Sequence, residues 1–175
     1  MNEVLKAMKE RRSIRQFRPD MVSREDLDTI IEAGLYAASG MGNQATVIVA
    51  VTNRELRDRL SAVNAKLMGQ GEAFDPFYGA PAVLIVLGNK KYPTFQYDGS
   101  LTMGNMMLAA HSLGLGSCWI HRAKEEFESD EFKSVLSELG LEGDFEGIGH
   151  CIVGYPAAEA PEAAPRKQAR VFYAE

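Results

Sequence analysis

The sequence predicts an α+β domain in which helices flank a sheet of four or five strands. Segments of helical periodicity alternate along the chain with runs of strand length. These runs are almost continuously apolar, which indicates strands covered on both faces. Together the two observations favour helices packed against a sheet. The four expected strands are bounded by turn residues and cover residues 46–52, 82–87, 117–121 and 147–154.

Most of the expected helices begin at a side chain that can cap a helix N-terminus. Asn2, Ser23 and Asn53 each precede an amphipathic segment, and Asp98 is the expected cap of the fourth helix. That fourth helix is apolar nearly all round, which is typical of a helix buried in a core or against a second chain. The five helices are expected over residues 2–11, 23–38, 53–67, 100–113 and 129–139.

Length and composition indicate one soluble domain, taken as residues 1–175. The chain has 175 residues, 46% of them hydrophobic and 25% charged, with a formal net charge of −5. An acidic protein is a poor general binder of nucleic acid, so no such partner is expected. The first residues lack a signal-peptide core and no apolar run reaches bilayer length, so we expect a cytoplasmic protein without a membrane partner. Cys118 and Cys151 have apolar neighbours and are expected to be buried, inert thiols.

A basic stretch follows the first expected helix and is an exception in this acidic chain. Arg11, Arg12, Ser13 and Arg15 fall within five residues. If the stretch is extended, Arg11, Ser13 and Arg15 point to one side, because side chains alternate along an extended chain. Two guanidinium groups and a hydroxyl on one face would suit an anion with several oxygens. The alternative is a solvated basic segment after a helix C-terminus.

Several familiar catalytic motifs are absent from the chain. It contains no GxGxxG, no GxxxxGK[ST], no HExxH and no GxSxG. The three histidines have no metal-ligand spacing, so no metal site is expected. Acidic residues are expected mainly on helix surfaces, which leaves no candidate for paired-carboxylate catalysis. A cofactor that brings its own reactivity would explain an enzyme with so few catalytic groups.

Five stretches, taken in order, resemble the nitroreductase family of FMN-dependent oxidoreductases. The resemblance covers nearly the whole chain and implies the three-layer α/β/α fold of that family, with a mixed, mainly antiparallel sheet, arranged as an intertwined homodimer. It also implies that the tail, residues 156–175, is extended and docks on the partner subunit. The stretches that carry the resemblance are RRSIRQF at 11–17, YAASGMGNQ at 36–44, NMMLAA at 105–110, LGLGSCWI at 113–120 and the segment 149–156 before a basic tail.

The resemblance implies an FMN phosphate site built from both ends of the chain. Arg11 and Ser13 would bind the phosphate, with Arg12 close to the ribityl-phosphate. Arg166 and Lys167, near the C-terminus, would complete the site.

The same resemblance implies contacts to the isoalloxazine ring. Arg15 would lie by the N1/O2 edge, where a positive charge stabilises anionic reduced flavin. A loop from the other subunit would cover the pyrimidine edge through Ser39 and Gln44. Gly42 stands where the family has an asparagine, and Asn43 is the candidate to replace its contact. A backbone N–H would face flavin N5 from the strand that contains Trp119, Ile120 and His121.

The activity implied is transfer of a hydride from NAD(P)H through flavin N5 to a small acceptor, such as a nitroaromatic or a quinone, by a ping-pong mechanism. No side chain is needed as nucleophile or base, so the work of the protein is orientation and charge stabilisation. His121 and Arg122 stand where the family often has glutamate and glycine, which leaves substrate identity open. The alternatives are an FMN storage or delivery protein with little turnover and a structural dimer without flavin.

Overall fold

One four-stranded antiparallel sheet forms the middle layer of the computed structural model, which describes residues 1–71 and 73–175. The strand order is β1-β2-β4-β3, and every pair of neighbours is antiparallel. Among the described residues, the parallel pairing consists of one isolated bridge between Ser117 and Ser13, which lies outside the four strands. The strands are β1 (Thr46–Val51), β2 (Ala82–Asn89), β3 (Gly116–Ile120) and β4 (Phe145–Gly154).

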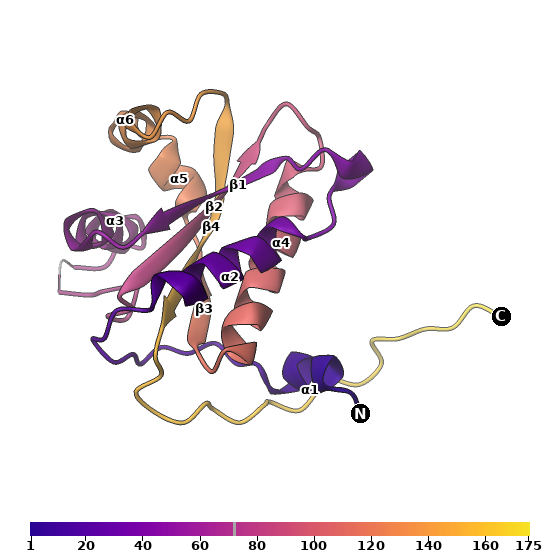
Figure 1. The fold of residues 1–175 in the computed structure, drawn as a ribbon. Coiled ribbons are helices and arrows are strands. Elements are labelled where there is room, and N and C mark those ends of the chain that lie inside the picture. The colour runs from indigo at the N-terminus through magenta and orange to yellow at the C-terminus, as the bar shows by residue number, and fades with distance from the viewer. Residues whose placement is uncertain (72) are drawn as a thin grey trace.

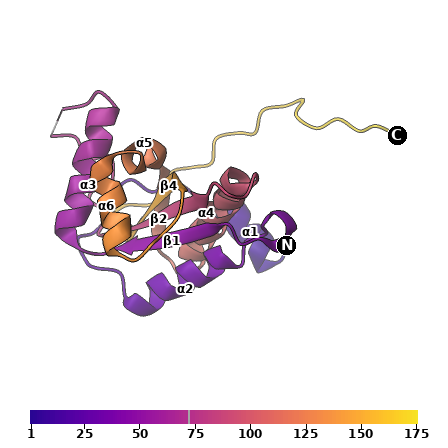
Figure 2. The same ribbon diagram turned by 90° about the horizontal axis from the view of Figure 1, so that it is seen from above.

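Helices cover both faces of this sheet, so the predicted three-layer architecture is confirmed. α2 and α4 lie on one face, and α3, α5 and α6 lie on the other (Figures 1 and 2). No helix in the described part of the chain is long and apolar enough to cross a membrane. The elements are α1 (Glu3–Glu10), α2 (Arg24–Leu35), α3 (Arg54–Leu67), α4 (Phe95–Ser112), α5 (Ala123–Phe127), α6 (Asp130–Glu138) and the 3₁₀ turn η1 (Gly40–Gly42).

The core is divided by the sheet into two apolar clusters. Alternate residues of β2 serve the two sides: Leu84 packs toward α2 and α4, while Ile85 packs toward α3 and α6. Gly34 allows close packing of α2 on α4, because a Cβ at this position would lie 2.6 Å from Cγ of Met106. Both cysteines are buried and free, as expected, Cys118 on one side of the sheet and Cys151 on the other.

Two strand predictions need correction. β2 is buried from Ala82 to Gly88, as a continuous apolar run predicts. β1 has the same composition but is an edge strand, and only Val51 is fully buried, so the expectation that both its faces are covered is wrong for the single chain. β4 begins two residues earlier than expected, at Phe145.

Two helix predictions also need correction. α4 begins at Phe95 rather than at residue 100, and Asp98 is a buried residue of its first turn instead of its cap. Its carboxylate accepts a hydrogen bond from Gly40 N–H at 3.0 Å and another from the Thr94 hydroxyl at 3.1 Å. These tertiary contacts hold the start of α4. The short helix α5 was not expected, because five residues are too few for a periodic signal.

Candidate functional site

The basic stretch is extended and tied to one end of the sheet, as predicted. Ile14 N–H donates to the Ser117 carbonyl of β3 at 3.0 Å. On its other side, Ala157 N–H donates to the Gln16 carbonyl at 3.0 Å. The segment therefore runs between β3 and the chain that follows β4, below the sheet in Figure 1.

The basic stretch borders two different hollows. Ser13 and Arg15 help to line a hollow of about 250 Å³, whose far wall includes Glu159. Arg12 lines a second hollow, of about 240 Å³, together with His111. Ile14 lines both hollows and Gln16 lines the first, so the lining does not separate alternate residues, and Arg11 lines neither hollow.

The arginines of this stretch have few partners within the described chain. Nη1 of Arg11 is buried and has no hydrogen-bond acceptor. Arg12 donates to its own helix end, to the Lys9 carbonyl at 2.7 Å and the Arg11 carbonyl at 2.6 Å. The guanidinium of Arg15 lies 5.9 Å from the ring centroid of Tyr78. In residues 1–71 and 73–175 none of the three forms an ion pair with a carboxylate.

A buried guanidinium nitrogen without an acceptor is unfavourable, because it has lost its water and gained nothing in return. An anionic ligand would remove that cost. The buried Nη1 of Arg11 is therefore better explained by an anion-binding role than by a solvated segment.

The charge of Arg11 also reaches the thiol of Cys151. Burial raises the pKa of Cys151 to about 12, the neighbouring Cys118 raises it further, and Arg11 opposes the shift. A thiol with this pKa stays protonated at neutral pH and is not a nucleophile.

At the other end of β3, the side chain of His121 is exposed, whereas the side chains of Trp119 and Ile120 pack in the core. Trp119 packs into the α2–α4 side of the core, and its indole rests on Gly149, where any Cβ would collide with it. Ile120 is buried on the opposite face. His121 is exposed, and Arg122 has a left-handed backbone with φ of 77°.

The loop that contains Ser39, Asn43 and Gln44 lies at the opposite end of the sheet from Ser13. The carbonyl of Ala45, directly after the loop, accepts a hydrogen bond from the Asn89 N–H at the end of β2. Ser13 instead pairs with Ser117 of β3, which is level with Val153 of β4 and so with the start of β2. Within the loop, Gln44 N–H donates to the Ser39 hydroxyl at 3.0 Å. One chain therefore does not bring this loop to the basic stretch.

The tail likewise does not bring Arg166 and Lys167 to the basic stretch of the same chain. It leaves the body after β4 and extends away from it (Figures 1 and 2), and both residues are exposed. Arg166 donates only to the nearby Ala164 carbonyl among the described residues. Phe172, farther along the tail, is 86% exposed.

Sequence reasoning missed a buried polar cluster behind His121. Asn64, Glu126 and His150 are each fully buried, on α3, α5 and β4. The expectation that acidic residues lie mainly on helix surfaces is wrong for Glu126 and also for Asp98. The one available signal was a histidine inside an apolar strand. Glu126 lies 24 residues and Asn64 lies 86 residues before His150 in the sequence (150 − 126 and 150 − 64), so no local sequence pattern connects the three.

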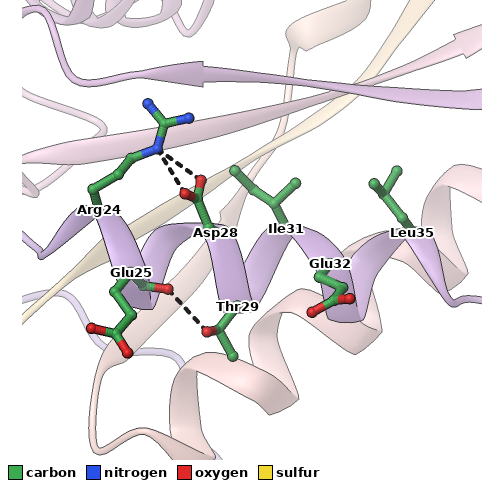
Figure 3. Close-up of a pocket in the computed structure, with 7 residues that line it drawn as sticks. All are labelled: Arg24, Glu25, Asp28, Thr29, Ile31, Glu32 and Leu35. Carbon is green, nitrogen blue, oxygen red and sulfur yellow. Dashed lines mark hydrogen bonds and ion pairs between the residues drawn. The ribbon is translucent and has the colours of Figure 1, made fainter.

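A larger hollow, of about 690 Å³, lies along the outside of α2 and is not a site. Figure 3 shows that all of its lining residues belong to this one helix. Arg24 is already paired with Asp28 at 2.8 Å, and Thr29 donates to the Glu25 carbonyl at 2.9 Å. With no groups from a second element, this surface cannot enclose a ligand.

Comparison with known proteins assigns the chain to a family. Residues 8–155 match the model of the Nitroreductase family. The chain belongs to this family. It is 31% identical over 181 residues to a protein of Vibrio harveyi named NADPH-flavin oxidoreductase, which covers 98% of this chain and 72% of that protein.

Two crystal structures of family members have the same fold. A nitroreductase with bound FMN from Bacteroides fragilis superposes with a TM-score of 0.88 at 31% identity, and covers 100% of both chains. Another with bound FMN, from Desulfitobacterium hafniense, gives a TM-score of 0.86 at 28% identity, again over 100% of both chains. The described elements therefore suffice for a complete family fold.

Proposed function

We propose that the protein is an FMN-dependent oxidoreductase that carries a hydride from NADH or NADPH to a small acceptor, such as a nitroaromatic or a quinone. The observation that carries the proposal is the buried, unpartnered Nη1 of Arg11, which lies beside Ser13 in a chain whose relatives hold FMN. Membership of the nitroreductase family supports the same activity.

Arg11 and Ser13 would hold the phosphate of FMN, with Arg12 close to the ribityl-phosphate. Arg15 lines the same hollow as Ser13 and would place its charge at the pyrimidine edge of the ring. FMN supplies two-electron chemistry when bound. A fixed positive charge near that edge favours the reduced, anionic form, and it costs no reorganisation because the guanidinium is already in place.

The remaining predicted contacts would come from a second copy of the chain. Ser39, Asn43 and Gln44 lie at the far end of the sheet, and Arg166 and Lys167 lie on an extended tail. A homodimer in which each copy supplies these groups to the other would complete two sites. An apolar hollow of about 430 Å³, formed by α1, α2 and α4, supports the pairing, because it would be covered by the partner.

Such an enclosed site would leave one open side at the reacting ring. The nicotinamide and the acceptor would then use that side in turn, which is the ping-pong mechanism. No side chain of this protein needs to act as nucleophile or base, because its part is to orient the rings and to exclude water. We further propose a cytoplasmic location, supported by the two free thiols.

The test is anaerobic stopped-flow reduction of the FMN-loaded protein by NADH and by NADPH, followed by a panel of acceptors. Initial rates at several concentrations of both substrates should give parallel lines in double-reciprocal plots. A protein that binds FMN tightly but is not reduced by either nicotinamide would instead be a storage or delivery protein. A protein that binds no FMN would refute the proposal.

A further inference from the structure

Three fully buried polar side chains, Asn64, Glu126 and His150, form one network behind the end of β3, in which Asn64 is the hydrogen-bond donor. Nδ2 of Asn64 donates to Oε1 of Glu126 at 2.5 Å and to the backbone carbonyl of His121 at 2.8 Å. Nε2 of His150 lies 2.9 Å from Oε2 of Glu126. Among the described residues this pair of atoms does not form a hydrogen bond, and Nδ1 of His150 and Oδ1 of Asn64 also lack a partner. The two hydrogen bonds donated by Nδ2 of Asn64 therefore hold the cluster together.

The network fixes which end of the Asn64 amide faces the β3–α5 turn. Both donors of its NH₂ group are used, one by Glu126 and one by His121. Because Glu126 accepts through Oε1, the amide nitrogen, rather than the amide oxygen, points toward the turn. His150 in turn lies against the other oxygen of Glu126 and limits rotation of that carboxyl group.

Holding the His121 carbonyl also sets the direction of the next N–H. The peptide between His121 and Arg122 is trans, so its C=O and N–H point in opposite directions. With the carbonyl directed into the core at Asn64, the N–H of Arg122 is directed away from the core. The left-handed backbone of Arg122, rarely adopted by residues other than glycine and asparagine, shows that this turn is strongly constrained.

We propose that Asn64, supported by Glu126 and His150, is a positioning residue that aims the Arg122 N–H at the reacting edge of the flavin. The proposal rests on the proposed function, since it requires FMN beside the end of β3. Asn64 itself does not touch the cofactor. Its effect passes through one peptide group, whose orientation decides whether a donor faces the ring.

The test compares Asn64→Leu and Asn64→Ala with Leu60→Ala in the full-length protein. Leu60 lies one turn earlier on α3, is 1% exposed, and belongs to the apolar core rather than to the network. Leu60→Ala therefore reproduces the loss of packing without touching His121. Each protein is loaded with FMN that carries ¹⁵N at N5, and the N5 resonance is measured together with the rate of FMN reduction by NADH and NADPH.

Both Asn64 variants should move the N5 resonance toward its position in FMN that lacks a hydrogen-bond donor. They should also slow flavin reduction about tenfold, equivalent to about 1.4 kcal/mol in the barrier. Leu60→Ala should lower the thermal midpoint but leave the resonance in place and the rate within about twofold of the parent.

An unchanged resonance in both Asn64 variants would overturn the proposal, as would equal changes in Leu60→Ala. If neither Asn64 variant folds, judged by circular dichroism, the network serves stability alone and the positioning role is wrong. These results would leave the oxidoreductase function standing. Failure of the parent protein to bind FMN would refute both.

Discussion

Arg11 should make the FMN-free protein less stable and the FMN-bound protein more stable. Its Nη1 is buried without an acceptor, and a buried unsatisfied donor costs about 1–3 kcal/mol. Arg11→Met keeps an unbranched apolar side chain and removes the guanidinium. The FMN-free variant should therefore be more stable than the parent, by about 1 kcal/mol once some relaxation around the buried nitrogen is allowed for.

The same substitution should weaken FMN binding. A hydrogen bond to a charged group contributes about 1.5–3 kcal/mol, so losing one at the phosphate raises the dissociation constant roughly 10- to 100-fold. Urea unfolding of the FMN-free protein measures the first effect, and quenching of FMN fluorescence in a titration measures the second. A variant that is more stable without FMN but binds FMN more weakly would show that Arg11 is positioned to bind an anion.

Arg18→Met is the matched control on the same segment. Arg18 is exposed, and its guanidinium lies 4.9 Å from the Tyr155 ring centroid, so it already has a partner. Its loss should change the FMN dissociation constant less than about threefold, equivalent to about 0.6 kcal/mol. The reasoning fails if Arg11→Met destabilises the FMN-free protein and leaves FMN affinity unchanged.

Three further predictions follow from other parts of the structure. Burial alone would raise the pKa of Asp75, but hydrogen bonds, first from Arg57 and Ser61, lower this pKa below 3.8. Asp75→Asn should therefore reduce the free energy of unfolding by about 1 kcal/mol at pH 7. That difference should vanish as the pH falls through 3.8 toward the lowered pKa, and urea unfolding at several pH values measures it. Equal losses at pH 7 and pH 2 would contradict it. Gly149→Ala should cost about 1–3 kcal/mol and shift the Trp119 fluorescence, because the new methyl collides with the indole; unaltered stability and emission would argue against that contact. Deleting residues 166–175 should weaken FMN binding about tenfold or more, since the deletion removes two cations expected at the phosphate, and an unchanged affinity would remove the tail from the site.

The sequence by itself determined the local elements and one half of the candidate site. Asn2, Ser23 and Asn53 each cap a helix by accepting a backbone N–H three residues on, which depends only on short-range geometry. The buried run of β2 and the extended basic stretch follow in the same way from the order of neighbouring side chains. Arg11, Arg12 and Ser13 could therefore be found as neighbours before any fold was known.

Tertiary structure alone decided which distant groups meet. Asp98 looked like a cap, but Gly40, 58 residues away, and Thr94 hold it inside the first turn of α4. Asn64 and Glu126 meet across 62 residues, because α3 and α5 pack on the same face of the sheet. Such pairings depend on sheet register and helix packing, which no local periodicity records. The role proposed for Arg11 also depends on tertiary structure. It rests on the absence of a hydrogen-bond acceptor around Nη1 among the described residues, and a donor becomes buried and unpaired only when the chain folds.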